Sequence, residues 1–199
     1  MKKICKMAVA AGLAGLVFAC NSTPDNVKDT DSANAHRSDS MSNQASVTDT
    51  SNAVPSKQDA EFMTKAASGG MLEVQLGQLA QTHGSSQRVK DFGAMMIKDH
   101  TRGGEELKTL AKRKRILLPD SISNDQMKMR DDLAKKSGTA FDRDYMKMMV
   151  DDHKEDVSEF DKASKNCNDP DIKAFAGNTL RMLRLHLDSA QAIHAGVKK

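Results

Sequence analysis

The helical period of the apolar side chains is the feature that most constrains the fold of this chain. In four long segments, apolar residues recur every three or four positions, which places them on one face of an α-helix. A weaker helical pattern spans about residues 124–136. The sequence therefore predicts an all-α four-helix bundle with a short extra helix in the middle connection. The four long segments run from about Lys57 to Thr82, Ser86 to Arg115, Thr139 to Lys165 and Asp169 to Ala195.

Three of the four long segments carry a methionine followed four positions later by a histidine. Each pair lies on the apolar face near the middle of its predicted helix. The first long segment has no such pair and carries Glu73 at the corresponding depth. With a rise of about 1.5 Å per residue, counting from the nearest turns places Glu73 and the three histidines within about two helical turns of one level. The pairs are Met96 and His100, Met149 and His153, and Met182 and His186.

Three imidazoles and one carboxylate at one level of a bundle favour a transition-metal site. A carboxylate on a core-facing stripe is costly unless it is paired or coordinated, and facing helices of bundles use such side chains as metal ligands. The predicted ligands are Glu73, His100, His153 and His186. Additional ligands or groups that support them are Met96, Met149, Met182, Asp99, Asp152 and Tyr145. Imidazole with carboxylate suits copper, zinc or iron, and thioether neighbours favour copper.

The pattern differs from that of di-iron bundle proteins, which need Glu-x-x-His on two helices. The residues three positions before the histidines are Ile97, Val150 and Leu183, so no such motif is present. Asp99 and Asp152 each precede a histidine directly and point about 100° away from it on a helix. They are therefore predicted to support the ligands or to face another surface. A single metal ion fits this sequence better than a ferritin-type centre.

Tyr145 is the only tyrosine of the chain and lies two helical turns before His153 on the same stripe. A buried phenol usually has a hydrogen-bond partner. The favoured interpretation is core packing with the hydroxyl at the edge of the bundle, and the alternative is a hydrogen bond to a buried acid or to the outer shell of the metal site. Replacement by Phe is predicted to cost about 1 kcal/mol through the lost hydrogen bond.

Two other functions stay open at this point. In the first, the His and Glu side chains form a hydrogen-bonded network without metal, in a structural or interaction module whose register it fixes. In the second, the chain is a small oxidase, which needs an open coordination position and access for a substrate. The sequence indicates neither of these two requirements, so an enzyme is the less favoured interpretation.

The N-terminus resembles a lipoprotein export signal. Residues 1–19 combine basic residues with a short apolar run, and the small Ala19 precedes Cys20 as in a lipobox. We expect cleavage before Cys20, lipid on this cysteine and attachment to a membrane of the cell envelope, on the outer membrane or facing the periplasm; the alternative is an ordinary secretory signal. Residues 20–55 are polar and predict a flexible tether, which leaves residues 56–199 for the folded domain.

Charge and cysteine content exclude some classes of function. The 30 Lys and Arg residues include three in the signal, so the rest of the chain balances its 27 Asp and Glu residues. This neutrality argues against nucleic acid as a partner, and no protein partner is indicated. Besides Cys5 and Cys20, only Cys167 is present, so we expect no disulfide within the mature chain.

Four phrases resemble the bacterial domain-of-unknown-function family 4142, whose members are described as ferritin-like and often as outer-membrane proteins. The resemblance covers about residues 56–195 and is specific in the order of its motifs. It implies an exported, ferritin-like helical bundle and little about chemistry. The phrases are AASGGMLEVQLGQLA (66–80), MMIKDHTRGGEELKTLA (95–111), FDRDYMKMMVDDHKEDVSEF (141–160) and FAGNTLRMLRLHLDSA (175–190).

Overall fold

The computed structural model describes residues 25–42 and 55–197, and these residues are almost entirely helical. The predicted all-α fold is confirmed, and the predicted short helix in the middle connection is α4. The helices are α1 (Asn26–Ser42), α2 (Lys57–His83), α3 (Gln87–Lys114), α4 (Asn124–Ala134), α5 (Gly138–Asn166) and α6 (Pro170–Val197).

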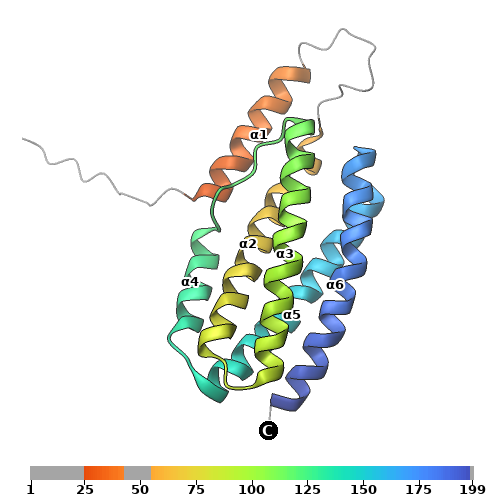
Figure 1. Cartoon of the computed structure of the whole chain (residues 1–199). Helices are drawn as coiled ribbons and strands as arrows, with labels where there is room; N and C mark the ends of the chain where they lie inside the picture. The colour runs from red at the N-terminus through yellow and green to blue at the C-terminus, as the bar shows by residue number, and fades with distance from the viewer. Residues whose placement is uncertain (1–24, 43–54, 198–199) are drawn as a thin grey trace, which may run out of the picture.

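The long helices α2, α3, α5 and α6 form the bundle (Figure 1). α2 packs antiparallel to α3 across a short turn, and α5 packs antiparallel to α6 in the same way. The connection from α3 to α5 runs back along the bundle through α4, which packs against α2 and α5. Because of this crossover, α3 and α5 run in the same direction, as in ferritin-like bundles.

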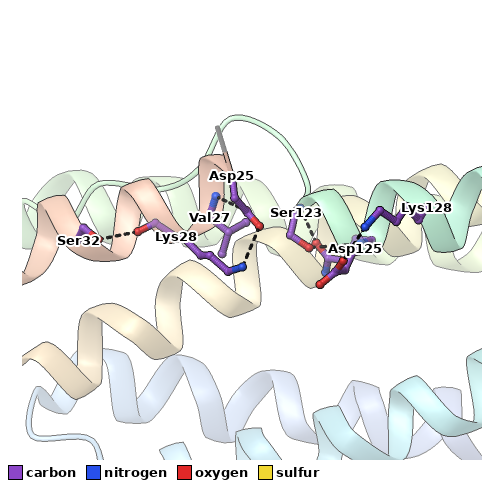
Figure 2. Close-up of polar contacts among 8 residues, drawn as sticks. Asp25, Val27, Lys28, Ser32, Ser123, Asp125 and Lys128 are labelled. Carbon is purple, nitrogen blue, oxygen red and sulfur yellow. Dashed lines mark hydrogen bonds and ion pairs between the residues drawn. The ribbon is translucent and has the colours of Figure 1, made fainter. Parts of the chain in front are cut away.

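Local sequence explains where several helices begin and end. The Ser56 hydroxyl accepts the N–H of Asp59 at 3.1 Å and caps α2. Ser123 and Gln126 form a capping box at the start of α4, where Ser123 is visible in Figure 2. Arg115 ends α3 in the left-handed region with φ 58°.

Two buried carboxylates hold the turns at opposite ends of the bundle. Asp142 on α5 accepts hydrogen bonds from the Ser85 N–H and hydroxyl at 3.0 and 2.6 Å and from the Ser86 N–H at 2.9 Å. Asp59 on α2 accepts the main-chain N–H groups of residues 168–169 at 2.9 and 3.1 Å. Each carboxylate thus ties one helix pair to the turn of the other, a role that sequence analysis did not detect.

The flexible tether predicted for residues 20–55 is wrong for Asn26–Ser42, which form α1 and pack against α2. Asn34 is 6 % exposed, accepts the Leu117 N–H at 2.9 Å and donates to the Leu117 carbonyl at 2.9 Å. The prediction considered only apolar burial. It missed a side-chain amide that satisfies both main-chain groups of one residue in the α3–α4 connection.

The first turn of α1 has local support as well. The Asp25 carboxylate accepts the Val27 N–H at 3.3 Å and lies 3.6 Å from the Lys28 ammonium (Figure 2). A carboxylate at this position satisfies a free N–H group and interacts favourably with the positive end of the helix dipole. The segment is therefore able to begin a helix despite its polar composition.

The apolar core consists of two clusters, one toward each end of the bundle. One includes Leu76, Met96 and Met149, and the other includes Met63 and Phe160. The buried polar residues described next lie between the two clusters. Across the described ranges, each helix is too short or too polar to cross a bilayer.

Candidate metal centre

Each bundle helix contributes one buried polar side chain to a single layer of the core. Glu73 comes from α2, His100 from α3, His153 from α5 and His186 from α6. Their exposed fractions are 2, 8, 0 and 2 %, respectively. The structure therefore brings together the four side chains predicted as ligands.

The distances within this layer are short. Glu73 Oε2 lies 2.6 Å from His100 Nδ1, and Glu73 Oε1 lies 3.3 Å from His153 Nε2. His153 Nε2 is 3.4 Å from His186 Nδ1. One nitrogen from each of the three histidines can be chosen so that all lie within 4.8 Å of one another. A small cation could contact all three rings with modest side-chain adjustment.

Hydrogen bonds on the outer sides of two rings fix which nitrogens carry protons. His153 Nδ1 lies 3.0 Å from the Met149 carbonyl oxygen, which can only accept, so Nδ1 carries the proton. His186 Nε2 lies 3.2 Å from Asp99 Oδ2 and donates to this carboxylate. A histidine held in this way through its outer nitrogen presents its inner nitrogen as a metal ligand.

The inner nitrogens of these two rings therefore face each other as lone pairs. With their outer nitrogens protonated, His153 Nε2 and His186 Nδ1 have no proton to share at 3.4 Å. Glu73 Oε1 points to the same place and has no hydrogen bond within the described residues. His100 Nε2 is also buried without a partner there. Converging buried acceptors are unfavourable unless a cation or an added proton lies among them.

The electrostatic environment keeps the rings neutral. Burial lowers the pKa of His100 to about 4, that of His153 to about 3 and that of His186 to about 4. Neutral imidazole is the form that binds metal ions, so these rings need not release a proton on binding at neutral pH.

Two further carboxylates of α5 lie beside Glu73. Asp152, Glu73 and His153 each offer an atom within 4.8 Å of the others, and Asp152 Oδ2 is buried without a partner in the described part of the chain. Burial raises the pKa of Asp152 to about 6, and burial followed by the charge of Glu73 raises that of Asp156 well above its usual range. For Glu73 itself, burial raises the pKa strongly, followed by the charge of Asp152. These raised pKa values favour the protonated, neutral forms of the carboxyl groups, so a bound cation would have to displace their protons.

The other residues named from the sequence take different positions. Asp99 supports His186 as described above, and Asp152 lies closer to the centre than its 100° offset suggested. Met149 contributes its main-chain carbonyl, and both it and Met96 are fully buried in the apolar cluster of Leu76. Met182 is half-buried and lines a cavity beside the layer.

The structure contradicts the hydrogen bond predicted for Tyr145. This side chain is fully buried, but its hydroxyl has no hydrogen-bond partner within residues 25–42 and 55–197. Its ring packs against Phe92, which also packs against the His153 ring, at centroid distances of 6.2 and 6.3 Å. Burial raises the Tyr145 pKa, followed by the charges of Glu73 and Asp152. The phenol therefore borders the polar layer without a partner.

The buried stripe of α6 also differs from the prediction in the first half of the helix. Met182 was expected to face the core, but it is half-buried and lines the cavity together with Phe175 and Thr179. The buried side chains there are Ala176, Leu180 and Leu183. Both sets have helical spacing, so periodicity alone does not distinguish them.

Comparison with known proteins identifies the family. The profile of a family described as "Domain of unknown function (DUF4142)" matches residues 44–193. The chain belongs to this family. The comparison with curated proteins gave no match.

Solved structures of low sequence identity share the fold. "CopM in the Cu(I)-bound form" is 17 % identical with a TM-score of 0.59, and "CopM in the Cu(II)-bound form" is 16 % identical with a TM-score of 0.57. Each alignment covers 69 % of this chain and 96 % of the CopM chain. At this identity, the similarity establishes the helical-bundle fold alone.

The lipoprotein signal, residues 1–19, and Cys20 lie outside the described residues. Cleavage before Cys20 and lipid on its thiol therefore stay predictions.

Proposed function

We propose that this protein binds a transition-metal ion in the polar layer of its bundle and serves in metal handling or stress protection in the cell envelope. The ligands are His153 Nε2, His186 Nδ1, one nitrogen of His100 and the carboxylate of Glu73. The observation that carries this proposal is the pair of unprotonated nitrogens that face each other at 3.4 Å beside an unpaired carboxylate oxygen. A metal ion supplies the positive charge that this arrangement of acceptors lacks.

Copper is the first candidate among copper, zinc and iron. Nitrogen and oxygen donors suit Cu(II), and its affinity exceeds that of the neighbouring divalent metals at a given site. The two CopM structures with the same fold are copper-bound forms, which supports the same choice here. In this proposal Asp99 orients His186, and the Met149 carbonyl orients His153.

The proposal places the protein in the cell envelope, attached through lipid on Cys20. A chain held there by its N-terminus can capture metal ions before they reach the cytoplasm. The proposed role is binding and release of the ion, and we propose no enzymatic activity.

The test is metal stoichiometry of the purified full-length chain, first treated with a chelator and then dialysed against Cu²⁺ or Zn²⁺. We expect about one tightly bound ion per chain. The variant His100→Ala/His153→Ala/His186→Ala should lose this ion. The other three histidines provide a matched control, because His36→Ala/His83→Ala/His194→Ala removes the same number of imidazoles elsewhere.

Circular dichroism must show that both variants stay helical, and Glu73→Gln gives a smaller change at the same site if the triple variant unfolds. Equal metal binding by the wild type and the site variant would eliminate the proposal. It would favour the rival function, a metal-free polar network that fixes helix register. That rival also predicts a melting temperature indifferent to chelator and to added metal.

A further inference from the structure

A cavity of about 280 Å³ lies directly beside the polar layer. Residues of α2, α3, α5 and α6 and of the connection after α3 line it. Glu73 and His100 form part of its wall, so the cavity borders two of the proposed ligands. Those ligands are otherwise enclosed, with exposed fractions of 8 % or less.

Four glycines in the middle of two helices form one side of this cavity: Gly69 and Gly70 on α2, and Gly103 and Gly104 on α3. A glycine within a helix costs about 1 kcal/mol relative to alanine, so four of them need a reason. None of them has a positive φ, since Gly138 is the described glycine that does.

Close packing does not supply that reason. A Cβ atom at Gly69, Gly103 or Gly104 would have no atom within 4 Å, and one at Gly70 would lie 3.9 Å from His100 Nδ1. The contrast is the Gly77 and Gly93 contact between the same two helices, where an added Cβ would lie 2.7 Å from the nearest atom. The helices therefore touch at Gly77 and Gly93, whereas an added Cβ would meet open space at Gly69, Gly103 and Gly104 and an ordinary contact at Gly70.

The chemistry of the cavity wall suits a passing cation. Asp156 on α5 lies in the wall with Glu73, and no Lys or Arg side chain of the described residues is paired with either carboxylate. Many of the other lining residues are small or apolar, and the wall also carries the Glu105 carboxylate and the thioether of Met182. The carboxyl groups of Glu73 and Asp156 line the same space, so each offers oxygen ligands to a cation that displaces its proton on the way to His100.

We propose that this glycine-lined cavity is the passage through which the metal ion reaches and leaves the polar layer. The glycines keep the passage open, and Asp156 offers a carboxyl oxygen as a ligand between the cavity and Glu73. This inference rests on the proposed function, because it concerns access to the same site. It predicts that the width of the passage controls the rates of loading and release, while the ligands control affinity.

The test fills the cavity and measures rates in the full-length chain. Tyr145 is the only tyrosine, the chain has no tryptophan, and the phenol borders the layer, so Cu²⁺ binding is followed by quenching of its fluorescence in a stopped-flow experiment. Release is followed after mixing with excess chelator. The variants are Gly103→Leu on α3 and Gly69→Leu on α2, either of which carries the test if the other does not fold.

The matched control is Gly177→Leu on α6, where an added Cβ makes an ordinary 3.7 Å contact with Ser164 outside the cavity wall. We expect both cavity variants to load and release Cu²⁺ about tenfold more slowly than the wild type, with a nearly unchanged dissociation constant. The control should keep wild-type rates.

Folded cavity variants that bind Cu²⁺ at wild-type rates would overturn the passage and leave the metal site intact. A lower affinity at an unchanged loading rate would also overturn it, because the cavity would then be part of the site. A wild-type chain that retains no metal in dialysis would instead refute the proposed function, and the passage with it.

Discussion

At the scale of single residues, outer hydrogen bonds orient two buried histidine rings, while other buried acceptor atoms of the same layer have no partner among the described residues. His153 and His186 are each fixed by an outer hydrogen bond, yet their inner nitrogens face each other without a proton. Buried polar groups in folded proteins are nearly always paired, so such a cluster requires an explanation. A bound cation would explain all of these unpaired atoms together.

Tyr145 gives a prediction at this scale. Its buried hydroxyl has no partner within the described residues, so Tyr145→Phe removes an unsatisfied polar group rather than a hydrogen bond. We expect the free energy of unfolding without metal to fall by less than about 0.5 kcal/mol or to rise by up to about 1 kcal/mol. Urea unfolding followed by circular dichroism measures it. A loss above about 1 kcal/mol would mean that the hydroxyl has a partner in solution.

At the scale of helices, the two groups of glycines between α2 and α3 act in opposite ways. Gly77 and Gly93 let the backbones touch, whereas Gly103 and Gly104 border open space. The same substitution should therefore have opposite effects at two positions of one helix.

Gly93→Ala places a methyl group 2.7 Å from the Ala80 Cβ and 2.9 Å from the Gly77 carbonyl oxygen. We expect it to cost about 1–3 kcal/mol through overpacking. Gly103→Ala meets no atom within 4 Å and should stabilise the protein by about 0.5–1 kcal/mol through helix propensity. Thermal unfolding measures the stability change of each variant, and each variant serves as the control for the other. Equal effects would refute the described contact between α2 and α3.

Helix α1 gives a second prediction at this scale. Asn34→Ala leaves both main-chain groups of Leu117 without their partner, so α1 should open more often. Hydrogen exchange should become about tenfold faster across 26–42 and at residue 117, while the bundle helices keep their protection. Ser32→Ala is the control, since its hydroxyl bonds only to Lys28 within α1. Unchanged exchange in Asn34→Ala would show that this amide does not hold α1 in place.

The predictability of these elements follows from their physics. Apolar periodicity predicted α2, α3, α5 and α6, because their stability comes from burying one face. It missed α1, which docks through Asn34, and it placed Met182 of α6 on the core face instead of the adjacent Leu183. The convergence of Glu73 with the histidines was predictable from their positions along the helices, counted from the nearest turns. The position of Asp152 was not, because α5 contacts both α2 and α6 and presents two adjacent residues to the core.

At the scale of the whole molecule, the polar layer connects the four bundle helices between two apolar clusters. In the proposed function, binding of one ion by a ligand from each helix would stabilise the folded chain by mass action. The metal site would thus be both the function of the bundle and a part of its stability.

Location is a prediction at the same scale. If Cys20 carries lipid, the full-length chain made in a bacterial cell should sediment with membranes, and Cys20→Ser should move to the soluble envelope fraction. Cys167→Ser is the control, because this cysteine is buried in the bundle and unrelated to the signal. Fractionation followed by immunoblotting measures how much of each variant sediments with membranes. A Cys20→Ser chain that still sediments with membranes would contradict lipid attachment.

Pulsed electron paramagnetic resonance of the Cu²⁺-loaded full-length chain tests the central claim most directly, because it detects the imidazoles bound to copper. We expect couplings to the remote nitrogens of more than one histidine, which weaken in His153→Ala and in His186→Ala and persist in His36→Ala/His83→Ala/His194→Ala. A spectrum that loses its imidazole couplings only in the latter variant would place the copper outside the bundle core and contradict the account.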